Sequence, residues 1–128
     1  MTPRKVLRHI FRFHGFIESF KFALKGMAYL FVYHRNMRII FLMGLAAFLL
    51  GIKYDLKGLE LVALCFAITL VFIAEIFNTA IEMMIDMFTR KYGTLIMLVK
   101  DIAAGVTLIA CLNAFAVGYI LFAHRIFR

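Results

Sequence analysis

The pattern of polar and apolar positions along the chain contains three long apolar stretches. Residues 39–52 and 61–74 contain no charged side chain, and neither do residues 102–123. A helix that crosses the hydrocarbon core of a bilayer needs about 20 predominantly apolar residues. The first run is shorter than this, but the polar residues that flank it can extend the helix by reaching back to the interface. The pattern therefore predicts three membrane-spanning helices, over residues 37–54, 61–88 and 95–123.

A different pattern precedes these runs. Residues 1–15 form a basic arm, and residues 16–34 combine many phenylalanine and leucine residues with a few charged ones. Glu18, Lys21 and Lys25 recur at steps of three and four, so in a helix they lie on one face. A helix with a basic stripe and an apolar remainder is typical of the membrane interface. We expect 16–34 to be a surface helix.

Composition supports the same class of protein. Of the 128 residues, 65% are hydrophobic and 17% are charged, whereas soluble domains have about 45–50% apolar and about 25% charged residues. The sequence therefore predicts an all-α integral membrane protein with one domain over residues 1–128. The net charge of +8, in so apolar a chain, indicates contact with anionic lipid and argues against a nucleic-acid partner. Cys65 and Cys111 form no CxxC pair, and we expect buried, inert thiols.

The basic residues are distributed unevenly between the two sides of the predicted spans. Most lie in the N-terminal arm, in the surface helix or in a predicted loop over 89–101. The opposite side carries only Lys53, Lys57, Arg125 and Arg128. Because Lys and Arg accumulate in cytoplasmic segments, we expect the N-terminus and the 89–101 loop to be cytoplasmic and the protein to lie in the cell inner (plasma) membrane.

The candidate chemistry lies at the end of the second predicted span. At 100° per residue, Glu75, Asn78, Glu82 and Asp86 are at about 0°, −60°, −20° and +20°, and thus share one face of a helix. Glu75 directly follows an uncharged run. A carboxylate inside the membrane costs about 2.5–3.5 kcal/mol even on the gentler insertion scale, so it indicates function. A structural ion pair or an interfacial cap is the alternative.

The residue types on this face suit phosphoryl transfer. Carboxylate and amide oxygens are ligands that magnesium prefers, and Lys100, beside Asp101, suits a phosphate group. A carboxylate at the bilayer edge could accept the proton of a lipid hydroxyl. Positioning and charge neutralisation do most of the work in phosphoryl transfer. The sequence has no P-loop and no kinase-type glycine-rich loop, so a nucleotide would bind outside the familiar soluble folds.

These residues also carry a family resemblance. The segment AEIFNTAIE (74–82), then Asp86 and then KDIAAG (100–105) resembles the small prokaryotic diacylglycerol kinase family, which includes the undecaprenol kinases. The resemblance covers about residues 16–123. It implies three transmembrane helices after a surface helix, a homotrimer with active sites between subunits, ATP as co-substrate and Mg2+. AEIFNTAIE and RNMR (35–38) look more like the undecaprenol branch, with diacylglycerol as the competing substrate.

Carried over by position, the resemblance implies a role for each residue. Glu75 would be the catalytic base at the lipid hydroxyl, and Glu82 would hold the metal. The nucleotide site would comprise Asn78, Glu82, Asp86, Tyr92, Lys100 and Asp101.

Two positions depart from the family pattern. His34 stands where the family usually has a second metal-binding Glu. Imidazole is a poor magnesium ligand, so His34 as a metal ligand would favour Mn2+. The family's Tyr-His-Pro loop reads Tyr92-Gly93-Thr94 here, which removes a phosphate-facing side chain.

The expected function is ATP-dependent phosphorylation of a membrane lipid alcohol, undecaprenol or diacylglycerol, to the lipid phosphate. His34 supports a second hypothesis, a catalytically impaired relative that acts as a non-enzymatic small membrane protein. A third class, the small multidrug transporters, would require four spans and a carboxylate in the first, and residues 39–52 contain none. Asn113, within the last apolar run, is expected to hydrogen-bond between helices.

Overall fold

The computed structural model describes residues 3–4, 13–87 and 93–127. Its long helices are α2 (Phe13–Tyr33), α3 (Arg35–Lys53), α4 (Leu59–Asp86) and α5 (Gly93–Ile126). Of these, α3, α4 and α5 are each long and apolar enough to cross a membrane. The all-α class, with an N-terminal helix followed by three candidate spans, is therefore confirmed. The chain divides into two compact units, residues 1–35 and 36–128, and each is described by itself.

The first unit contains α2, in which the charged and apolar side chains are both exposed. Glu18, Lys21 and Lys25 are exposed on the polar side, and the Nζ of Lys25 lies 5.8 Å from the centroid of the Phe22 ring. Exposed aromatic side chains beside a basic stripe are the features expected of an interfacial helix. The helix ends at Tyr33, one residue before the predicted end.

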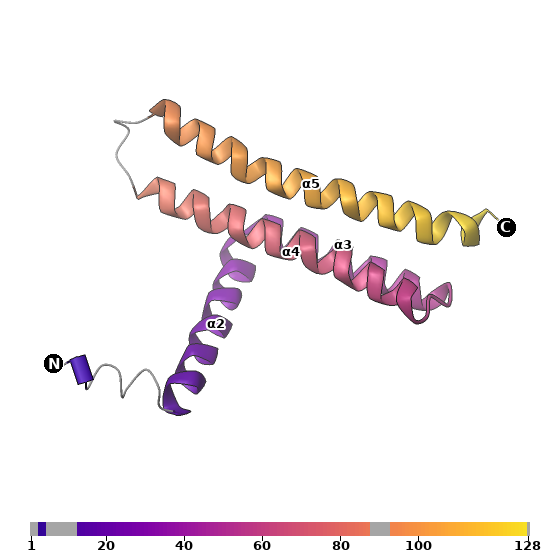
Figure 1. The fold of residues 1–128 in the computed structure, drawn as a ribbon, viewed down its shortest axis with the longest axis horizontal. Helices are drawn as coiled ribbons and strands as arrows, with labels where there is room; N and C mark the ends of the chain where they lie inside the picture. Colours follow the sequence, from indigo (N-terminus) through magenta and orange to yellow (C-terminus); the bar gives the residue numbers. More distant parts are fainter. Residues whose placement is uncertain (1–2, 5–12, 88–92, 128) are drawn as a thin grey trace. The chain divides into compact units, whose positions relative to one another are not determined.

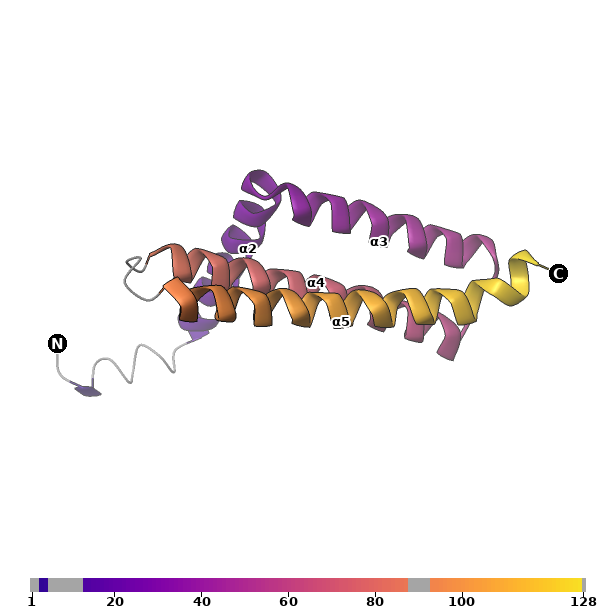
Figure 2. The ribbon, with the colours of Figure 1, turned by 90° about the horizontal axis from the view of Figure 1, so that it is seen from above.

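In the second unit, α4 and α5 pack along a continuous seam. On α4, Leu64, Ala67 and Ala74 are buried at separations of three and seven residues, and on α5 Ala103 and Ala110 are buried seven residues apart. This spacing is that of helices packed at a shallow angle. Small residues in the seam let the two backbones approach closely. Figures 1 and 2 show α4 and α5 running along a common direction, joined at one end.

Two glycines allow α3 to approach α4. A Cβ added to Gly44 would lie 2.9 Å from Cγ2 of Ile68, and one added to Gly51 would lie 2.8 Å from Cδ2 of Leu64. Gly44 and Gly51 are seven residues apart, so they lie on the same side of α3. At these two positions the lack of a side chain lets Ile68 and Leu64 of α4 pack against the backbone of α3.

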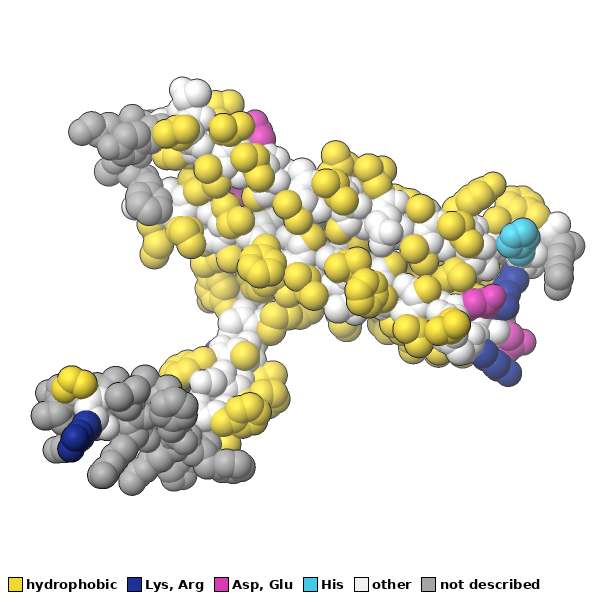
Figure 3. All heavy atoms as spheres, viewed as in Figure 1, with side chains coloured by type: hydrophobic (Ala, Val, Ile, Leu, Met, Phe, Trp, Pro, Cys, Tyr) yellow, Lys and Arg dark blue, Asp and Glu magenta, His cyan; other side chains and the backbone are white. Residues whose placement is uncertain are grey.

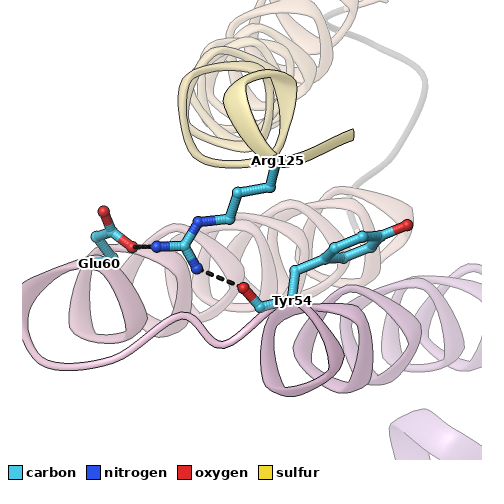
Figure 4. Close-up of polar contacts among 3 residues, drawn as sticks. All are labelled: Tyr54, Glu60 and Arg125. Carbon is cyan, nitrogen blue, oxygen red and sulfur yellow. Dashed lines mark hydrogen bonds and ion pairs between the residues drawn. The ribbon is translucent and has the colours of Figure 1, made fainter. Parts of the chain in front are cut away.

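The end of the bundle that carries the α3–α4 connection is held by Arg125 of α5 (Figure 4). Its Nη1 donates a hydrogen bond of 2.5 Å to the carbonyl oxygen of Tyr54, and its Nη2 lies 2.7 Å from Oε2 of Glu60. The Tyr54 ring meets the Phe122 ring edge-on, with centroids 6.1 Å apart. Figure 3 shows hydrophobic side chains over most of the visible face of α4 and α5, with basic and acidic ones together at this end and acidic ones near the opposite end.

The last predicted helix, over 95–123, is present and begins two residues earlier, so the segment 89–101 is helical from residue 93 onward. The structure begins α5 at Gly93, so Lys100 and Asp101 lie within a helix. No glycine or proline follows Gly93 before Gly105, and nothing therefore interrupts the helical pattern there. The same helix continues to Ile126, beyond the predicted end at 123, because the basic side chains near its end can reach back to the interface.

Candidate functional site

The candidate site begins at a buried carboxylate in α4. Glu75 is 5% exposed, and Thr79, one turn further along the helix, is 4% exposed. Ala74, directly before Glu75, is also buried, and its carbonyl oxygen accepts a hydrogen bond of 3.4 Å from Oγ1 of Thr107 on α5. A carboxylate kept inside an apolar membrane helix is expensive and typically functional. Glu75 is thus the strongest candidate for chemistry in the described part of the chain.

From Glu75 the polar face of α4 leads outward to solvent. Because α4 is unbroken from Leu59 to Asp86, the predicted face is continuous over the 12 residues from 75 to 86, about 16 Å along the axis. Asn78 is half-buried, whereas Glu82 and Asp86 are exposed. The face therefore joins a buried end, at Glu75, to a solvent-exposed end, at Asp86.

Lys100 of α5 lies at the solvent-exposed end of this face. Its Nζ lies 3.5 Å from Oδ1 of Asp86, and the two side chains are 43% and 71% exposed. An exposed pair of this kind contributes only about 0–1 kcal/mol, so it can open easily when a more strongly charged ligand arrives. Asp101, the next residue along α5, is exposed.

Two predicted site residues are not joined to this face by the structure. Tyr92 lies outside the described residues. His34 belongs to the first unit, where it is half-buried and its ring centroid lies 6.0 Å from that of Tyr29. The pairing of His34 with Glu82 at one metal thus stays a prediction.

The oxygen atoms on the α4 face fit a magnesium ion that arrives with a nucleotide. Among the described residues, no group of three or more His, Cys, Asp or Glu side chains could hold a metal ion alone. However, Oδ1 of Asn78 is buried and has no hydrogen-bond partner in that part of the chain, and Glu82 follows one turn later. Magnesium typically keeps several waters and binds through one or two carboxylates plus substrate phosphates. This donor set matches that mode rather than a closed protein cage.

Sequence reasoning missed two threonines. Thr79 is buried four residues after Glu75, and Thr107 of α5 reaches the backbone beside Glu75. The i, i+4 relation to Glu75 could have drawn attention to Thr79. Thr107 follows Lys100 by seven residues, so both lie on one side of α5. This spacing could have drawn attention to Thr107.

The similarity of this chain to known proteins covers much more than the candidate face. The family model described as prokaryotic diacylglycerol kinase matches residues 21–122. A protein named diacylglycerol kinase from Synechocystis sp. (strain ATCC 27184 / PCC 6803 / Kazusa) is 35% identical over 103 residues, which are 80% of this chain and 59% of that relative. This chain therefore spans less than two thirds of the relative's length. The match to the family model includes every candidate residue from His34 to Asp101, and the chain belongs to the prokaryotic diacylglycerol kinase family.

Proposed function

We propose that this protein transfers the γ-phosphate of ATP to the hydroxyl group of a membrane lipid alcohol. The observation that carries the proposal is the burial of Glu75 in α4, on a polar face that ends at the exposed Asp86–Lys100 pair. A lipid hydroxyl reaches a protein from the bilayer and a nucleotide reaches it from water. A site that joins a buried carboxylate to exposed charges serves both substrates.

In this proposal Glu75 accepts the proton of the lipid hydroxyl as its oxygen forms a bond to the γ-phosphorus. The bond from that phosphorus to the β–γ bridging oxygen breaks, and ADP leaves with the electron pair. Burial keeps water away from Glu75, which limits hydrolysis of ATP without lipid. A general base positioned in this way contributes about 10²–10⁴-fold in rate.

The exposed part of the face would bind the nucleotide. Lys100 leaves its ion pair with Asp86 and binds the phosphates. Asp86, Asp101 and Tyr92 complete the nucleotide site. Bound Mg2+ would neutralise charge that develops on the transferred phosphoryl group. Glu82 and the unpartnered Oδ1 of Asn78 would hold the metal, with His34 as a further ligand that shifts the preference toward Mn2+.

Diacylglycerol and undecaprenol are the two candidate acceptors. The family and the relative are both named for diacylglycerol kinase, which favours diacylglycerol. The AEIFNTAIE and RNMR segments look more like the undecaprenol branch, which keeps undecaprenol as the second candidate.

The proposed assembly is a homotrimer in the inner membrane, with the N-terminus and the α4–α5 connection in the cytoplasm. Asn113 is exposed on α5, within an apolar run. An amide in the hydrocarbon core needs a hydrogen-bond partner, and a second copy of the chain could supply one. The excess of Lys and Arg in the segments before α3 supports the orientation.

In the direct test, the purified protein in lipid nanodiscs is incubated with labelled ATP. The reaction contains dioleoylglycerol, undecaprenol or neither lipid. We expect labelled lipid phosphate with at least one acceptor, and loss of the product when the divalent metal is chelated. Absence of product with both lipids, in protein shown to be folded, would contradict the proposal. It would support the non-enzymatic alternative.

A further inference from the structure

A large apolar groove lies between α3, α4 and α5. It has a volume of about 690 Å³, within the range of about 300–1,000 Å³ typical of small-molecule sites. Its walls include Met43 and Ala47 from α3, Ala67 and Val71 from α4, and Phe115 and Gly118 from α5. All three helices belong to the same unit of the chain. A groove so poor in polar groups suits hydrocarbon and excludes a charged headgroup.

The inner end of the groove lies beside the candidate base. Val71 lines the groove and precedes Glu75 by four residues, which is one turn of α4. On α5, Cys111 lines the groove and follows Thr107 by four residues. Because Thr107 hydrogen-bonds to the carbonyl of Ala74, the groove starts about one turn from Glu75 on both helices.

An aromatic pair lies at the outer end of the groove. Phe122 lines the groove, and the ring of Tyr54 packs edge-on against it. Arg125 holds the Tyr54 carbonyl and Glu60, which fixes this end in place. Cys111 and Phe122 are 11 positions apart, about 16 Å of helix, which is comparable with half of the roughly 30 Å hydrocarbon core.

We propose that this groove holds one hydrocarbon chain of the substrate lipid while the lipid hydroxyl lies at Glu75, and that the aromatic pair at its outer end limits the length of chain accepted. The inference rests on the proposed function. The position of the inner end of the groove, one helical turn from Glu75, favours a chain of the substrate over a helix of a second copy. The length of the groove matches an acyl chain of one leaflet, so diacylglycerol fits better than the much longer undecaprenol.

Gly118 offers a way to shorten the groove without a clash, because a Cβ added there meets nothing within 4 Å. The test compares kcat/KM of wild type, Gly118→Leu and Ala116→Leu for dioctanoylglycerol, dilauroylglycerol, dioleoylglycerol and undecaprenol. Ala116 is exposed on the same helix and does not line the groove. We expect Gly118→Leu to lower the ratio of dioleoylglycerol to dioctanoylglycerol activity about tenfold or more, the scale on which apolar pockets discriminate added methylenes. Ala116→Leu should leave the ratio unchanged.

An unchanged ratio in Gly118→Leu would overturn the inference and leave the proposed function standing. So would an equal loss with every lipid, since that would show a structural role for the groove. Inactivity of wild type toward all four lipids would instead refute the proposed function, and the groove would then be tested by binding alone.

That binding test uses fluorescence, because the chain contains no tryptophan. Phe115→Trp places a single indole in the groove, and Phe66→Trp places one on an exposed part of α4 outside it. In phosphatidylcholine nanodiscs with a small fraction of diacylglycerol brominated in its acyl chains, we expect stronger quenching of Phe115→Trp than of Phe66→Trp. Equal quenching would overturn the inference. Quenching of Phe66→Trp alone would assign the groove to a second copy of the chain and overturn it equally.

Discussion

Removal of the Arg125 side chain's charge should destabilise the bundle far more than removal of its acidic partner. In Arg125→Met the side chain keeps much of its apolar stem but loses the hydrogen bonds to the Tyr54 carbonyl and to Glu60. Glu60→Gln removes only the charge of the second partner. Comparing the two variants therefore separates the carbonyl bond from the ion pair.

The structure sets the magnitudes of the two effects. A hydrogen bond that involves a charged group contributes about 1.5–3 kcal/mol. The Arg125–Glu60 pair is partly exposed, with side chains 29% and 46% accessible, and such pairs contribute about 0–1 kcal/mol. We therefore expect a loss of about 2–3 kcal/mol for Arg125→Met and less than about 1 kcal/mol for Glu60→Gln. The effect of Glu60→Gln should also shrink at high salt.

Thermal unfolding in detergent micelles measures this difference. Cys65 and Cys111 are both free, so a thiol-reactive dye reports their exposure as the protein unfolds. For a chain of this length, the loss expected for Arg125→Met corresponds to a fall in Tm of roughly 5–10 °C. Equal Tm shifts for Arg125→Met and Glu60→Gln, or no shift for Arg125→Met, would refute the importance of the carbonyl bond.

Three further predictions concern the site and the packing beside it. Lys100→Ala should raise the KM for ATP severalfold and leave that for the lipid almost unchanged, because Lys100 lies at the exposed end of the face; equal effects on both constants in steady-state kinetics would count against it. His34→Glu should raise turnover with magnesium relative to manganese, since oxygen ligands suit the smaller, harder ion; unchanged metal titrations in both His34→Glu and His34→Ala would remove His34 from the metal site. Gly44→Ala should lower the free energy of unfolding by about 1 kcal/mol, because its Cβ would press on Ile68; an unchanged Tm would show that Ile68 moves aside without cost.

The helices were predictable because their signal is local. Uncharged runs define α3, α4 and α5, and the recurrence of Glu18, Lys21 and Lys25 defines the polar side of α2. The shared face of Glu75 and Asp86 likewise follows from helical periodicity, given one unbroken helix. Helix ends were less predictable, since α5 begins at Gly93 and ends at Ile126, whereas residues 95 and 123 were predicted. Charged residues near a span do not by themselves mark where its helix stops.

Contacts between distant segments could not be read from the pattern. Arg125 and Glu60 are 65 positions apart, and Thr107 and Ala74 are 33 apart. Periodicity assigns a face to each residue but does not say which residues of two helices lie at the same level. The pairing of Lys100 with Asp86 likewise depends on that level.

The central claim is that Glu75 is the general base, and one variant tests it most directly. Glu75→Gln preserves the size of the side chain and removes its ability to take a proton. With dioleoylglycerol and labelled ATP, we expect the turnover of Glu75→Gln to fall by about 10²–10⁴-fold, while its binding of a non-hydrolysable ATP analogue and its oligomeric state match wild type. Glu18→Gln, altered at an exposed carboxylate on α2, should retain full turnover. Turnover of Glu75→Gln close to that of wild type would contradict the account.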